Sequence, residues 1–270
     1  MAPEKVTPTP PGAGPKRNVA MPPARDSYRQ YFETVVVGEE DDALRDAAFR
    51  LRYQVYCIEN PFEDPADNPD GRERDTYDER AVHCLLLHLP THSWAGAVRL
   101  ILPDQNAPEH SFALQQVCTD PTIFQPELFP VQEMGEISRF CISKEFRKRQ
   151  GDWLYPRSNE PEQREHQRRI IPNMTLGLIE GLVQISLDHG IYYWCAVMER
   201  PLLRLLARLG IHFKDIGPLV DYHGHRQPCL IKLDTMLTQV QTERPDVWDI
   251  LTDGGQHWDR LVSLQSGRSE

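Results

Sequence analysis

One apolar segment limits most strongly how this chain can fold. From Ile170 to His189 the residues are apolar on most faces of a helix, and Gly190 follows directly. A helix that is apolar on most faces has to be buried, and a glycine commonly ends a helix. The sequence therefore predicts a long helix that is buried against a β-sheet.

Segments on both sides of this helix indicate the fold class. β-Branched or apolar runs predict strands, and apolar residues at helical spacing predict helices. The predicted strands cover residues 32–37, 81–87, 96–101, 135–143, 192–198, 213–222 and 229–233. The predicted helices cover residues 41–55, 170–189 and 200–209, with another near the C-terminus. This order is typical of a mixed α/β domain, with an early antiparallel hairpin and a later crossover helix.

The distribution of residue types suggests one domain with two flanking segments. Residues 1–26 are rich in proline, alanine and glycine, and predict a disordered leader. Residues 27–240 form the expected α/β domain. Residues 241–270 have amphipathic character and predict a C-terminal helical extension and tail.

Charge and cysteine content narrow the class of protein. The formal net charge of −10 argues against general nucleic-acid binding, which requires a basic surface. The six cysteines are widely spaced without a C-x-x-C pair, which indicates a reducing compartment rather than disulfides or a zinc site. No segment approaches the roughly 18 apolar residues that a membrane span needs. A cytoplasmic enzyme without an integral membrane segment is expected.

Four short motifs occur in a fixed order along the predicted domain. They are Arg52-x-x-x-Tyr56, Asp75-x-x-Asp78, Arg99 on a predicted strand, and Glu136-Ile137-Ser138-Arg139-Phe140. This order resembles the acyl-homoserine-lactone synthases and the N-acyl amino acid synthases. The most similar group is the PEP-CTERM/exosortase system-associated acyltransferases, and the resemblance runs from about Tyr31 to Leu233.

The resemblance implies a fold, a reaction and substrates. The implied fold is GNAT-like: a central mixed sheet, flanked by helices, whose middle strands splay apart to admit a pantetheine arm. The implied enzyme is an N-acyltransferase. Its donor would be an acyl-acyl-carrier-protein or acyl-CoA, its acceptor would be a small-molecule amine, and no cofactor would be tightly bound. An acyl carrier protein is the expected partner.

Two departures from the lactone synthases bear on the acceptor. Those enzymes usually carry Phe where Tyr56 stands and a Trp several residues later, whereas here residues 57–62 read Cys-Ile-Glu-Asn-Pro-Phe. This favours an amino acid or related amine over S-adenosylmethionine. The alternatives are a lactone-type autoinducer synthase, or a non-catalytic domain that binds acylated carrier protein.

Glu136 is the candidate general base. Attack of an amine on a thioester requires a deprotonated amine, and burial on a central strand would raise the pKa of this carboxyl toward a useful value. A structural role, in which Glu136 pairs with an arginine or holds a loop, is the alternative.

Arg139 lies three residues after Glu136, and odd spacing on a regular strand sends two side chains to opposite faces. A β-bulge between them would restore a common face. The backbone N–H groups near Phe140 and Cys141 would then polarise the thioester carbonyl. Arg139 as a structural ion-pair partner and Cys141 as a packing residue, rather than a nucleophile, are the alternatives.

The earlier motifs are candidate substrate contacts. Arg52 and Tyr56 are four residues apart and share a helix face, where the arginine could bind the carboxylate of the acceptor. Asp75 and Asp78 could hold an ammonium group, and Arg99 needs a partner in mid-strand. A structural network, in which the two arginines pair with these aspartates and clamp a loop, is equally consistent with the pattern.

Two basic clusters are candidates for donor binding. Arg147, Lys148 and Arg149 follow the strand that carries Glu136, and Arg168 and Arg169 precede the long helix. On an acidic protein, such a local positive site suits an acidic carrier protein through electrostatic steering. A solvated loop is the alternative.

Overall fold

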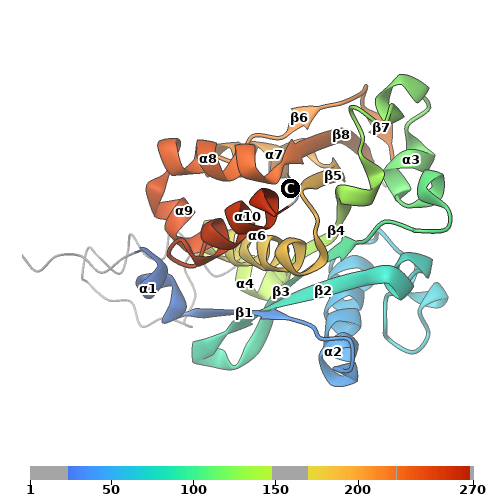
Figure 1. Cartoon of the computed structure of the whole chain (residues 1–270). Coiled ribbons are helices and arrows are strands. Elements are labelled where there is room, and N and C mark those ends of the chain that lie inside the picture. Colours follow the sequence, from blue (N-terminus) through green and yellow to red (C-terminus); the bar gives the residue numbers. More distant parts are fainter. Residues whose placement is uncertain (1–23, 148–169, 223, 268–270) are drawn as a thin grey trace, which may run out of the picture.

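The computed structural model describes residues 24–147, 170–222 and 224–267, which form one mixed sheet with helices on both faces (Figure 1). The strands of this described part are β1 (Phe32–Val36), β2 (Ala81–His88), β3 (Ser93–Ile101), β4 (Met134–Ile142), β5 (Tyr193–Met198), β6 (Lys214–Asp215), β7 (Val220–Asp221) and β8 (His225–Lys232). Their order in the sheet is β1-β2-β3-β4-β5-β8-β6, and β7 pairs with β8. The predicted α/β class is confirmed.

The connection between β4 and β5 determines the topology. These two central strands are parallel, whereas β1–β2, β2–β3, β3–β4 and β5–β8 are antiparallel. Parallel neighbours need a crossover connection, which here includes the long helix α6 (Ile170–His189). The predicted hairpin is the β2–β3 pair, and the predicted crossover helix has the predicted bounds.

The remaining helices surround this sheet. They are α1 (Ala24–Arg29), α2 (Asp42–Tyr53), α3 (Ala113–Val117), α4 (Lys144–Arg147), α7 (Arg200–Arg208), α8 (Leu233–Glu243), α9 (Pro245–Leu251) and α10 (Gln256–Ser266). A π-helical turn, Gln54–Glu59, continues α2. Short 3₁₀ turns occur at Pro65–Asp67, Thr76–Arg80, Leu89–Thr91, Pro108–His110, Pro121–Phe124 and Val131–Glu133.

Three segments differ from the sequence prediction. The predicted strand at 213–222 is reduced to two-residue strands β6 and β7, because its central residues turn between them. The expected boundary after residue 26 falls inside α1, and the one after residue 240 falls inside α8. The C-terminal region forms α9 and α10, which pack with α8 and α6 and belong to the same core.

Side chains of β2 point alternately to the two faces of the sheet, one covered by α6 and the C-terminal helices and the other by the α2 region. Cys84 and Leu86 belong to the main cluster, which includes α6 and the C-terminal helices. Leu85 belongs to a second cluster, which also contains Ala48 and Val55 of the α2 region. This alternation is the two-residue period of a strand that is buried on both faces. The predicted burial of α6 is confirmed by residues such as Leu178, Leu182 and Val183, each fully buried.

Two glycines allow α6 to lie close to the sheet. A Cβ atom at Gly181 would lie 2.2 Å from Sγ of Cys84 and 3.1 Å from Cγ2 of Thr34. A Cβ atom at Gly177 would collide with the hydroxyl of Tyr28 at 2.0 Å. Glycine weakens a helix interior, so its presence here reflects the close packing.

We expect Gly181→Ala to lower the free energy of unfolding by about 1–3 kcal/mol, because a methyl group has no room beside Cys84. Urea unfolding monitored by circular dichroism measures the change. Gly38→Ala is the matched control, since Gly38 is exposed and a methyl group added there would meet no atom within 4 Å. An unchanged stability for Gly181→Ala would contradict the packing argument.

Two further findings concern membranes and thiols. Within the described residues, no helix is both long and apolar enough to cross a bilayer. All six cysteines are buried free thiols.

Candidate active site

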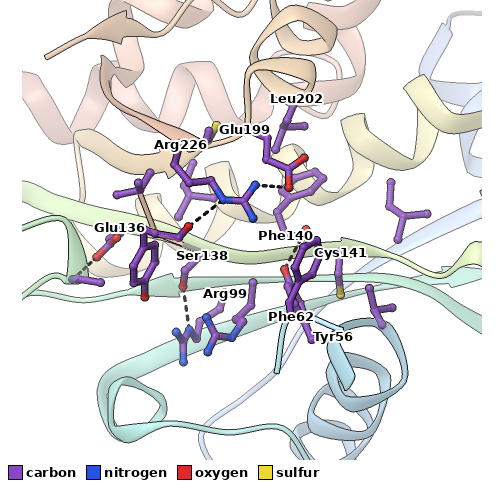
Figure 2. A pocket seen from close by; sticks show the side chains of 18 of the residues that line it. Tyr56, Phe62, Arg99, Glu136, Ser138, Phe140, Cys141, Glu199, Leu202 and Arg226 are labelled. Atoms are coloured by element: carbon purple, nitrogen blue, oxygen red, sulfur yellow. Dashed lines mark hydrogen bonds and ion pairs between the residues drawn. The ribbon is translucent and has the colours of Figure 1, made fainter. Parts of the chain in front are cut away.

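The site lies where the two central strands part. β4 pairs with β5 only from Met134–Tyr193 to Ile137–Ala196, although β4 continues to Ile142. A cavity of about 560 Å³ opens beyond this point between β4, α7 and the π-helical turn. The splayed central strands that the resemblance implied are thus present. Figure 2 shows the side chains that surround this cleft.

A β-bulge shapes the β4 wall of the cleft. Ala97 pairs with Cys141 and Arg99 pairs with Ser138, so two residues of β4 lie opposite Val98 alone. Arg139 has a φ of 51°, in the left-handed region that non-glycine residues seldom adopt. Glu136 and Arg139 both line the cavity. The bulge is present and both side chains line one cavity, while their roles in catalysis stay predictions.

Glu136 is a buried carboxyl that lines the cleft. Its side chain is 3% exposed and its Oε2 accepts a hydrogen bond of 2.7 Å from the backbone N–H of Ala113. Burial raises the pKa of Glu136 to about 7, and the hydrogen bonds from Ala113 and Leu114 oppose this shift. The group therefore has the pKa of a useful base near neutral pH, and it also holds the start of α3.

A network of arginines and carboxylates lies behind the bulge. Arg52 donates to Glu73 and Asp78, each at 2.6 Å, and is 1% exposed. These paired carboxyls have pKa values held below their usual range, although burial alone would raise them. Arg52 does not line the cavity. The structure therefore supports loop clamping for Arg52 instead of the predicted contact with an acceptor carboxylate.

The two aspartates are engaged by arginines as well. Asp75 accepts hydrogen bonds from Arg99 at 2.6 Å and from Arg139 at 3.0 Å. Asp78 accepts from Arg99 at 2.7 Å in addition to Arg52. The aspartates are also joined in a capping box on the turn that begins at Thr76. They are not among the residues lining the cavity, so the predicted ammonium contact is replaced by ion pairs with arginines.

Arg99 and Arg139 connect this network to the cleft. Both line the cavity, and Nε of Arg99 donates to Oγ of Ser138 at 2.9 Å. Nε of Arg139 donates to Glu73 at 3.0 Å. The two guanidinium groups are held rigidly by buried carboxylates and contribute positive potential at the wall of the site.

Tyr56 supports the bulged strand. Its hydroxyl donates to the carbonyl oxygen of Phe140 at 3.3 Å, and Arg139 lies over its ring at 5.6 Å. Tyr56, Phe140 and Cys141 all line the cavity. Cys141 also belongs to the cluster beside α2, as the packing alternative predicted.

Several lining residues were not identified from the sequence. They are Phe62, Tyr77, Glu199, Leu202, Leu205, Tyr222 and Arg226. The hydroxyl of Tyr77 is buried and has no hydrogen-bond partner in the part of the chain that the structure describes. Tyr77 lies between two motif aspartates, which was a usable signal. Glu199 and Arg226 come from separate elements, and no sequence pattern connects them.

The cleft has a polar part and an apolar part. Glu136, Arg99 and the tyrosines Tyr77 and Tyr222 provide the polar lining. The apolar lining includes Val55, Phe140, Ile142, Val197, Met198, Pro201, Leu202 and Leu205. Among the described residues, no group of three or more His, Cys, Asp or Glu side chains is arranged to hold a metal ion.

The basic clusters are only partly within the described structure. Arg147 is the last residue of the short helix α4, directly after the strand that carries Glu136. Lys148, Arg149, Arg168 and Arg169 lie outside the described residues. Their assignment to donor binding stays a prediction.

A cleft between two parting parallel strands, with a bulged strand on one wall, defines the GNAT-like class of fold. In agreement, residues 51–155 match the family model of the acetyltransferase (GNAT) domain. This match, which covers part of the chain, supports the predicted class of enzyme, an N-acyltransferase. No curated protein sequence matches the chain.

Two of the three solved structures described next, BjaI and TofI, support the same fold. The CoA-dependent acyl-homoserine lactone synthase BjaI, solved with SAM and isopentyl-CoA, aligns with a TM-score of 0.51 at 19% identity, covering 83% of this chain and 88% of its own. TofI, solved with an inhibitor and MTA, aligns with a TM-score of 0.50 at 19% identity, covering 80% of this chain and 96% of its own. FeeM, an N-acyl amino acid synthase from uncultured soil microbes, reaches 0.45 at 13% identity over 77% of this chain and 94% of its own. At these identities the likeness concerns the fold alone.

Proposed function

We propose that this protein transfers an acyl group from an acyl-carrier-protein or CoA thioester to the amine of an amino acid or a related small molecule. The observation that carries the proposal is a buried carboxyl, Glu136, with a pKa near 7, which lines a cleft that also has an apolar lining. The fold supplies a gap between β4 and β5 into which a thioester arm can enter.

The residues suit direct transfer without a bound cofactor. The amine nitrogen attacks the thioester carbonyl carbon, and Glu136 accepts the amine proton directly or through a water. The tetrahedral intermediate then collapses: the C–N bond remains, the C–S bond breaks, and the thiol leaves with a proton. Tyr77, whose hydroxyl has no hydrogen-bond partner among the described residues, and Arg99 both line the cavity and are candidates to stabilise the oxyanion.

The apolar lining suits a hydrocarbon chain. Phe140, Leu202 and Leu205 bring apolar side chains from β4 and α7 to the cleft. Burying a methylene group stabilises a complex by roughly 0.8 kcal/mol, so a longer chain gains affinity until the cavity is filled. A cytoplasmic location and an association with the PEP-CTERM/exosortase system remain predictions.

Product analysis tests the proposal. Purified protein is incubated with acyl-carrier-protein or acyl-CoA thioesters and pooled amino acids, and the products are identified by mass spectrometry. An N-acyl amino acid is expected. An acyl lactone that forms only with S-adenosylmethionine would identify an autoinducer synthase instead, and binding of acylated carrier protein without turnover would identify a non-catalytic domain.

Charge reversal tests the choice of donor. Replacing Arg147, Lys148 and Arg149 by glutamate should raise KM for the acyl-carrier-protein donor at least tenfold, with a smaller effect on acyl-CoA. The physical reason is that an acidic carrier protein is steered by charge over a larger surface than CoA. Raising the salt concentration should reduce the difference in KM for the acyl-carrier-protein donor between the wild-type protein and this variant, because salt screens charges. Equal effects on the two donors would contradict a docking role for these residues.

A further inference from the structure

The guanidinium of Arg226 links the two walls of the cleft (Figure 2). On one wall, Nη1 pairs with the carboxylate of Glu199, the residue directly before α7. On the other wall, the guanidinium lies over the ring of Phe62, 5.7 Å from its centroid. Nε also donates to the carbonyl oxygen of Tyr222 at 3.3 Å. Arg226 therefore presents its charge within the cavity that Glu136 lines.

Glu199, a carboxylate partner of Arg226, is more exposed than buried carboxylates that hold the other site arginines. Arg99 pairs with Asp78, whose side chain is 7% exposed, and Arg139 pairs with Glu73, whose side chain is 3% exposed. Glu199 is 46% exposed. Breaking a buried pair leaves an uncompensated charge, whereas a surface carboxylate returns to water at little cost. Glu199 can therefore leave its arginine when another anion arrives.

The environment of Arg226 strengthens an interaction with an anion. Its side chain is 14% exposed, and burial lowers the pKa of Arg226 from its usual value. The guanidinium nevertheless stays charged at neutral pH. A charged group that has lost water and has a displaceable partner binds an incoming carboxylate through strong, charge-assisted hydrogen bonds.

We propose that Arg226 binds the carboxylate of an α-amino acid acceptor, and that Glu199 occupies the place of this carboxylate in the ligand-free protein. The inference rests on the proposed function and specifies its acceptor class. The amine and the carboxylate of an α-amino acid are attached to the same carbon. A carboxylate held at Arg226 therefore restricts where the amine can lie in the cleft that contains Glu136.

Paired acceptors test this assignment. Acyl transfer is measured at saturating donor with an amino acid and with the amine that lacks only its carboxylate. Arg226→Gln should raise KM for the amino acid about 10- to 100-fold, the range expected for a charge-assisted pair, and leave KM for the amine unchanged. Arg226→Lys should have a smaller effect, since lysine retains the charge without the fork geometry. Glu199→Gln should lower KM for the amino acid, because it removes the competing carboxylate.

Controls separate this role from others. Arg50→Gln removes an arginine that pairs with a carboxylate, Asp46, but lies on the exposed side of α2, and it should change neither KM. Equal increases for both acceptors with Arg226→Gln, or an increased KM for the donor alone, would overturn the proposal. If thermal unfolding shows that Arg226→Gln does not fold, the test uses Arg226→Lys and Glu199→Gln in its place. An unchanged KM for the amino acid in both of these variants would overturn the proposal. A wild-type protein that acylates neither acceptor would instead refute the proposed function.

Discussion

Replacing Glu136 by glutamine should lower kcat by about 10²- to 10⁴-fold, the usual contribution of a general base. Glutamine keeps the shape of the side chain and can still accept the hydrogen bond from Ala113, but it cannot take a proton from the amine. Steady-state kinetics with one donor and one amine acceptor measures the loss. KM for the donor should change little, because Glu136 acts on the acceptor.

The pH profile gives this prediction a second readout. The carboxylate is the active form, and the pKa of Glu136 is raised to about 7 by burial. The rate of the wild-type protein should therefore rise as the pH increases through about 7, and this limb should be absent from Glu136→Gln. A profile with the same limb in both proteins would assign it to another group.

Glu180 provides a matched control. It is also buried, and burial likewise raises its pKa to about 7. Glu180 lies on α6 beside Thr34 and Arg29, and it does not line the cleft. Glu180→Gln should therefore leave kcat within about twofold of the wild-type value. A large loss of kcat in Glu180→Gln would mean that replacing a buried carboxyl lowers the rate by weakening the fold. The loss in Glu136→Gln would then no longer indicate a general base.

Replacing Arg52 by methionine should lower the free energy of unfolding by about 3–5 kcal/mol, the usual cost of leaving buried charges without a partner. Arg52 is 1% exposed and contacts Glu73 and Asp78, which are also buried. Urea unfolding monitored by circular dichroism measures the change. Arg50→Met, on the exposed side of the same helix, should change stability by less than about 1 kcal/mol.

The effect of Arg52→Met should depend on pH in a defined direction. The arginine holds the pKa of Asp78 well below its usual range. A carboxyl with a lowered folded-state pKa contributes stability that is present above its unfolded pKa of about 4 and is lost as the pH falls toward the folded value. The difference in stability between wild type and variant should therefore narrow below about pH 4. A constant difference would mean that lost packing, rather than charge pairing, causes the destabilisation.

The parts of the fold that depend on local pattern could be predicted from the sequence. The apolar character of α6 determines its burial, and the short linker between β2 and β3 determines their antiparallel pairing. The bulge could be predicted from the odd spacing of Glu136 and Arg139 only together with the expectation that both line one site, because a strand has a fixed period of two.

The site could be predicted only where its residues share a motif. Arg52 could have contacted either a substrate or a loop, and its role depends on which carboxylate lies beside its guanidinium. In the structure this carboxylate is Glu73, a loop residue that belongs to none of the motifs. Arg226 and Glu199 meet because α7 begins beside β8, and their separation in the sequence carries no signal of that contact. Contacts between distant segments follow from tertiary packing, which local pattern does not encode.

The bulge in β4 makes the length of this strand as important as its composition. Removing one residue between Ser138 and Cys141 would restore strict alternation and abolish the bulge, which is the feature that brings Glu136 and Arg139 to one cavity. The loop at residues 103–107 has no such periodicity, so a deletion there would shift few side chains. Insertions and deletions should therefore be tolerated far less in this strand than substitutions of its individual side chains.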